Sequence, residues 1–145
     1  MSRFRLDVST VLALVDQQHQ FHRAVNAWAR RAPDSRWLTC PIVQNGAVRI
    51  ASQPAYSRRL GGPEAVRRVM QAFRAHPRHE FCPDDISLLD DEHIVRPDLL
   101  TPKAVTDVYL LALARHHGAR LATFDRKIVS DAVRGGYDAL EVIDA

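Results

Sequence analysis

The stretch from residue 101 to residue 126 constrains the fold most, because it reads as a helix followed at once by a short buried strand. Thr101 and Pro102 are typical of a helix start, and Gly118 is typical of a helix end. Between them, apolar side chains recur at helical spacing. The run ARLATF that follows is too short for a second helix and apolar enough for a strand buried in a sheet.

Two aspartates in this stretch are expected at the same height. A helix from Asp107 to Gly118 travels roughly 16 Å at 1.5 Å per residue. A strand from Ala119 to Asp125 travels back roughly 20 Å at 3.3 Å per residue. One carboxylate therefore lies at the start of the helix and the other at the end of the strand, close to the same edge of the sheet.

The rest of the chain shows the same alternation of short apolar runs and helical patterns. Strands are expected at 4–7, 37–40 and 140–143, with a brief strand and turn at 80–85. Helices are expected at 10–16 (with Ser9 as its cap), 19–31, 41–50 and from 63 onward, with Val66, Val69, Met70 and Phe73 as the buried face of the last. Residues 86–89 are predicted to pack as a short element and 130–134 as one helical turn, with loops at 55–62 and 90–100.

This order predicts a single α/β domain over residues 1–145, with a central, mostly parallel sheet of four to five strands covered by helices on both faces. In such sheets, ligands bind beyond the carboxyl ends of the strands. Asp7 and Asp125 end or follow strands, and Asp107 lies in the N-terminal part of a helix that runs antiparallel to the strands. Gln44 lies in the first turn of the helix after the second strand, so we expect it at the same edge.

Three carboxylates at one edge are the oxygen ligands that Mg²⁺ and Mn²⁺ prefer, and such ions activate water for phosphodiester hydrolysis. Each acid also has an ordinary structural reading. Asp7 suits a helix cap, Asp125 a turn residue, and Asp107 a solvated acid favoured by the helix dipole. Their coincidence at one edge favours a metal site.

Composition limits the function classes. A hydrophobic share of 46% and a charged share of 26% are ordinary for a soluble globular protein. No segment resembles a signal peptide or a membrane span, and two cysteines are too few for a disulfide framework, so we expect a cytoplasmic protein. The net charge of +3 comes almost entirely from arginine and favours nucleic-acid binding only modestly.

Four runs, LDVSTVLALVD, CPIVQNGAVRI, TDVYLLALARHHG and RLATFD, together resemble a VapC-type toxin of the PIN-domain ribonuclease superfamily. The resemblance covers essentially the whole chain and implies a three-layer α/β/α, Rossmann-like sandwich. It also implies an Mg²⁺- or Mn²⁺-dependent ribonuclease whose site is blocked by a cognate antitoxin. The family acids fall on Asp7, Asp107 and Asp125. A further family Glu falls on Gln44, which carries no charge, so weaker metal binding is expected.

Other polar residues are assigned supporting or structural roles. Ser9 and Thr106 are candidates to hydrogen-bond the site carboxylates or their waters. Four arginines form either an RNA-backbone contact or a solvated surface: Arg58, Arg59, Arg67 and Arg68. No set of His and Cys has zinc spacing, so solvated or capping roles are expected for six histidines: His19, His22, His76, His79, His116 and His117. Asp84 and Asp85 are interpreted as turn and cap residues.

The leading hypothesis is a metal-dependent endoribonuclease toxin that acts on RNA, pairs with an antitoxin and forms a homodimer. The alternative is a catalytically weakened PIN-like protein that binds RNA or antitoxin without efficient cleavage, which Gln44 favours. A phosphatase with Asp7 as nucleophile fits less well, because Ser9 occupies the place of its second acid.

Overall fold

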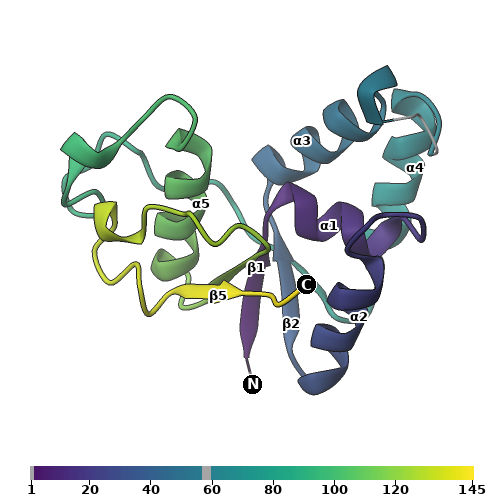
Figure 1. Cartoon of the computed structure of the whole chain (residues 1–145), viewed down its shortest axis with the longest axis horizontal. Coiled ribbons are helices and arrows are strands. Elements are labelled where there is room, and N and C mark those ends of the chain that lie inside the picture. The colour runs from purple at the N-terminus through teal and green to yellow at the C-terminus, as the bar shows by residue number, and fades with distance from the viewer. Residues whose placement is uncertain (1, 57–59) are drawn as a thin grey trace.

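The computed structural model describes residues 2–56 and 60–145, which build one five-stranded sheet (Figure 1). The strands are β1 (Arg3–Leu6), β2 (Arg36–Thr39), β3 (His79–Phe81), β4 (Arg120–Thr123) and β5 (Leu140–Val142). Their order is β3-β2-β1-β4-β5, and all four neighbouring pairs are parallel. The carboxyl ends of all five strands therefore meet at one edge.

Helices cover both faces of this sheet. They are α1 (Val8–Val15), α2 (His22–Arg31), α3 (Pro41–Ala51), α4 (Pro63–Arg74) and α5 (Val105–His116), joined by single 3₁₀ turns at Pro54–Tyr56, Pro97–Leu99 and Ser130–Ala132. Helices α1 to α4 lie on one side of the sheet and α5 lies on the other (Figure 1). The predicted three-layer α/β/α sandwich with a parallel sheet is confirmed.

The apolar patterns bury as expected. Leu6, Leu38 and Leu121, each from a different central strand, have no exposed surface, as strands covered on both faces require. Helix α5 buries six of its apolar side chains: Val108, Leu110, Leu111, Ala112, Leu113 and Ala114. Proline opens both α3 and α4, where its missing N–H costs no helical hydrogen bond.

Several boundaries differ from the sequence-based expectation. Helix α5 starts at Val105 rather than Thr101, because residues 101–104 form a turn in which Thr101 Oγ1 accepts the Ala104 N–H at 3.3 Å. Helix α2 starts at His22, three residues later than predicted. Helix α1 is capped by Asp7 and not by Ser9, which lies inside its first turn.

The prediction that residues 86–89 pack as a short element is confirmed only in part, because Ile86 and Leu88 pack against the core. The segment has neither helix nor strand, and Leu89 is 88% exposed. It belongs to the long connection from β3 to α5. Among the helices of the described residues, none is long and apolar enough to cross a membrane.

Candidate metal centre

Asp7 lies between β1 and α1, and both of its carboxylate oxygens are held in place. Oδ1 accepts hydrogen bonds from the Thr10 N–H at 2.9 Å and from Thr10 Oγ1 at 2.7 Å. Oδ2 accepts from Thr123 Oγ1 at 2.6 Å, across the sheet in β4. The side chain is therefore a helix cap and, at the same time, a rigidly oriented carboxylate at the carboxyl edge of the sheet.

Asp125 approaches this edge from β4. It follows the last strand residue by two positions, and its N–H donates to Thr123 Oγ1 at 3.1 Å. One hydroxyl group thus links the positions of Asp7 and Asp125. The carboxylate of Asp125 is exposed and accepts the Lys127 N–H at 2.8 Å, so it also makes the turn predicted for it.

Asp107 completes the acidic group from the opposite face of the sheet. It lies in the first turn of α5 and is partly buried. Burial, together with the negative charges of Asp7 and Asp125, raises its pKa from 3.8 to about 6. The three acids are thus near enough to act on one another electrostatically.

The pKa of Asp7 is also raised. Burial raises the pKa of its carboxyl group, and the charge of Asp125 adds to this. Hydrogen bonds from Thr123 and Thr10 lower the pKa but do not cancel the rise. Such a group resists full ionisation until a cation neutralises it. We name Asp7, Asp107 and Asp125 the acidic cluster.

The predicted supporting residues lie in different places. Gln44 is in the first turn of α3 as expected, but its side-chain amide donates to Thr39 Oγ1 at 3.1 Å. Ser9 and Thr106 are both exposed. The hydroxyl groups that bond Asp7 belong instead to Thr10 and Thr123, which the sequence patterns did not single out. The capping pattern D-x-x-T at residues 7–10 was the signal for Thr10.

The predicted RNA-contacting arginines separate into three groups. Arg58 and Arg59 lie outside the described residues. Arg68 is exposed and pairs with Glu64 one helical turn away at 2.8 Å. Arg67 lines a groove of about 600 Å³ between α3 and α4, together with Gln44 and Arg74.

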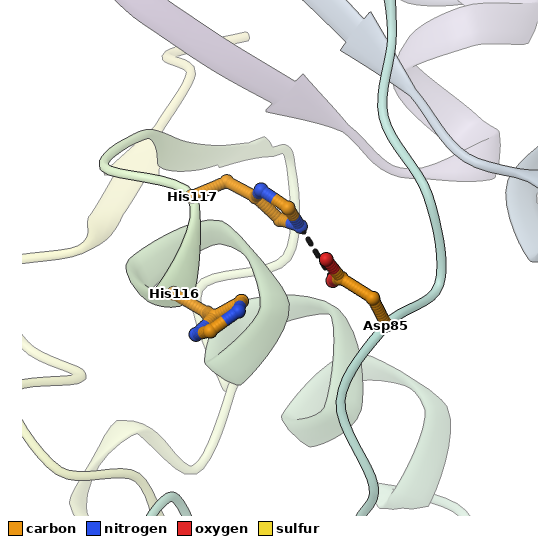
Figure 2. A group of neighbouring side chains, drawn as sticks. All are labelled: Asp85, His116 and His117. Carbon is orange, nitrogen blue, oxygen red and sulfur yellow. Dashed lines mark hydrogen bonds and ion pairs between the residues drawn. The ribbon is translucent and has the colours of Figure 1, made fainter.

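The structure also contains a second polar group that the sequence patterns did not predict. Asp85, His116 and His117 converge at the other end of α5 from Asp107 (Figure 2). The adjacent histidines at a helix end were visible in the sequence. Their acidic partner was not, because it comes from the irregular connection after β3.

Comparison with known proteins agrees with this geometry. Residues 5–132 match the family model described as PIN domain. The chain is 42% identical to "Ribonuclease VapC44" of Mycobacterium tuberculosis over 134 residues, which is 92% of this chain and 93% of that protein.

Two solved structures share the fold. A crystal structure of VapBC2 from Rickettsia felis, bound to a DNA fragment from the promoter, superposes with a TM-score of 0.62 at 14% identity. That alignment covers 98% of this chain and 99% of the other. Mycobacterium tuberculosis VapC20, described as a sarcin-ricin loop cleaving toxin, gives a TM-score of 0.61 at 17% identity, covering 90% of this chain and 96% of the other.

Proposed function

This chain belongs to the PIN-domain family and, within it, to the VapC ribonucleases, and from that premise we propose that it is a metal-dependent endoribonuclease, the toxin of a toxin–antitoxin pair. The observation that carries the proposal is the acidic cluster. At the edge where parallel sheets bind ligands, burial together with nearby negative charge raises the pKa of both Asp7 and Asp107, and Asp125 contributes to each rise. Carboxylates of the same charge placed together do not stabilise a fold, so their grouping indicates a binding role.

The donor set fits Mg²⁺ or Mn²⁺. Carboxylate oxygens are hard ligands, and none of the three acids offers nitrogen or sulfur. We assign Asp7, Asp107 and Asp125 as the residues that would hold the ion. When bound, such an ion neutralises phosphate charge and activates a water for hydrolysis.

The protein's own contribution is orientation. The N–H and hydroxyl groups of Thr10 occupy both lone-pair directions of Oδ1, and Thr123 occupies one of Oδ2, which leaves the second lone pair of Oδ2 for a ligand. Asp125 is the most exposed of the three acids, so it lies on the side from which a solvent-borne phosphate arrives. Asp107 closes the cluster from α5.

The weakened, non-cleaving alternative rests on Gln44. Its amide is bonded to Thr39 and it lines the groove between α3 and α4. Three acids remain grouped without it, so we favour cleavage. Gln44, Ser9 and Thr106 stay proposals as residues that position water. As a substrate we propose RNA, and as partners a cognate antitoxin and a second copy of the chain, in the cytoplasm.

The decisive experiment is a cleavage time course on structured RNA with purified protein. We expect cleavage with Mn²⁺ or Mg²⁺, none with chelator, and a loss of at least 100-fold in Asp125→Asn. Asp138→Asn, an exposed acid before β5, serves as the matched control and should cleave like the unaltered protein. Equal cleavage with chelator and with metal would overturn the proposal.

A further inference from the structure

A group of side chains with nitrogen and oxygen ligand atoms lies at the C-terminal end of α5. We propose that Asp85, His116 and His117 bind a transition-metal ion of the Zn²⁺ class, separate from the acidic cluster. Their ligand atoms, one carboxylate oxygen and two imidazole nitrogens, all lie within 4.8 Å of one another. Figure 2 shows the Asp85 carboxylate directed toward the helix end, where it meets the His117 ring.

The contact distances suit a shared ion after a small adjustment. Asp85 Oδ1 and His117 Nε2 are 2.7 Å apart, a hydrogen bond in the absence of metal. Two ligands on a tetrahedral Zn²⁺ with bonds of about 2.0 Å lie roughly 3.3 Å apart. The pair therefore needs to separate by roughly 0.6 Å, and any ligand atoms as far apart as the 4.8 Å limit need to approach by roughly 1.5 Å.

The histidines are supported by their surroundings. The backbone oxygen of His117 accepts a hydrogen bond from the Arg3 side chain at the start of β1. The His116 ring packs edge-on against the buried His93 ring, with centroids 5.4 Å apart. These contacts fix the end of α5, so both rings are positioned before any ion arrives.

The Asp85 carboxylate lies within 4.8 Å of a ring nitrogen of both histidines, and its Oδ1 is 2.7 Å from His117 Nε2. A plain ion pair would explain Asp85 and His117. It does not explain the second imidazole nitrogen within the same 4.8 Å.

Ligand type separates the two sites. Imidazole nitrogen with one carboxylate suits Zn²⁺, Ni²⁺ or Co²⁺, whereas carboxylates alone suit Mg²⁺ and Mn²⁺. Three protein ligands leave a fourth position for water. The ion would join two segments 32 positions apart, so its role is to fasten the connection after β3 to α5.

The test measures metal binding, not cleavage. The protein is stripped with chelator and titrated with ZnCl₂ by calorimetry, in an Asp107→Asn/Asp125→Asn background that removes the acidic cluster. We expect one Zn²⁺ per chain, a raised melting temperature and, with Co²⁺, visible absorption typical of tetrahedral coordination. MgCl₂ should leave the melting temperature unchanged in this background.

Two single variants and one control decide the outcome. His116→Ala removes an exposed side chain and Asp85→Asn keeps the shape of the acid, so both should fold, and each should weaken Zn²⁺ binding at least tenfold. His76→Ala, another exposed histidine, should bind like its parent. The proposal is overturned if Zn²⁺ does not bind stoichiometrically, or if both variants bind as tightly as the control.

Discussion

At the scale of single residues, two threonines decide how Asp7 is presented. Thr10 satisfies Oδ1 from the helix that Asp7 caps, and Thr123 satisfies Oδ2 from the neighbouring strand. Partners of this kind, which hold a ligand without touching the ion, commonly change metal affinity by about 10- to 100-fold when removed. The sequence patterns assigned this role to Ser9 and Thr106, which are exposed.

Thr123→Val keeps the size and branching of the side chain but removes the hydroxyl that donates to Asp7. The buried Oδ2 then lacks its partner, which costs about 1–3 kcal/mol. We expect the Mn²⁺ concentration for half-maximal cleavage to rise at least tenfold. Ser2→Ala removes an exposed hydroxyl at the other end of β1, so it is the control and should leave that concentration unchanged. If both variants behave alike, Thr123 does not position the carboxylate.

Asp107 makes the stability of the metal-free protein depend on pH. Its pKa is raised from 3.8 to about 6 on folding, so the folded state holds the proton more tightly than the unfolded state. The stabilisation from the protonated form is complete below pH 3.8 and is lost as pH rises through 6. Ionised Asp107 therefore destabilises the folded protein at neutral pH.

Asp107→Asn should accordingly stabilise the protein in chelator at pH 7.5, on the order of 1 kcal/mol once solvent screening of this partly exposed group is allowed for. The difference should vanish near pH 3.5. Urea unfolding at both values measures it. With Mg²⁺ present the order should reverse, because only the unaltered protein gains stability from the ion. A variant less stable than its parent in chelator would contradict the repulsion.

At the scale of elements, helix α5 joins both candidate cation sites, with Asp107 at its start and His116 and His117 at its end. The lengths of the helix and of the strand after it were enough to predict that Asp107 lies near Asp125. The helix and the strand that follows it run in opposite directions over known lengths, so Asp107 and Asp125 had to meet. Element lengths therefore predicted that Asp107 and Asp125 lie near one another, whereas Asp7 was placed by the strand that it follows.

The features that the sequence did not predict have a common physical cause. Helix α5 starts at Val105, later than predicted, because a local turn at Thr101 competes with the helix. A turn and a helix start both favour Ser, Thr, Asn and Asp, so the sequence does not distinguish them here. The position of Asp85 beside His117 depends on the path of an irregular connection, which no periodicity describes. Regular elements were predictable, whereas contacts made by loops were not.

The packing of α3 on α1 gives a test at this scale. A Cβ atom at Gly46 would lie 2.8 Å from Val8 Cγ2, on a branched side chain with little freedom to move. Gly46→Ala should therefore destabilise the protein by about 1–3 kcal/mol through overpacking. Arg49→Ala, at an exposed position of the same helix, is the control, since Arg and Ala have similar helix propensities. Chemical unfolding of both variants should show a midpoint shift for Gly46 only.

At the scale of the whole molecule, the net charge of +3 does not reveal that several arginines are concentrated in one groove. Arg49, Arg67 and Arg74 all line the groove between α3 and α4. Thr39 and Gln44 line it too, and they stand at the carboxyl end of β2 and the start of α3. The groove thus extends from the edge of the sheet that carries the acidic cluster, and its arginines are where we propose that an RNA backbone binds.

Neighbouring arginines on α4 separate a groove contact from surface charge. Both are exposed, but Arg67 lines the groove, whereas Arg68 is paired with Glu64. RNA binding is measured in chelator, with an Asp125→Asn parent that does not cleave. Removing one cation that pairs with a phosphate of single-stranded RNA reduces the salt dependence of binding by about 0.7 in log–log slope. Arg67→Ala should therefore weaken binding several-fold and flatten the slope by that amount.

Arg68→Ala has the same formal charge change and should shift neither the affinity nor the slope appreciably, since its charge is partly neutralised and lies outside the groove. Equal losses in the two variants would mean that RNA responds to total charge and that the groove is not its path to the acids.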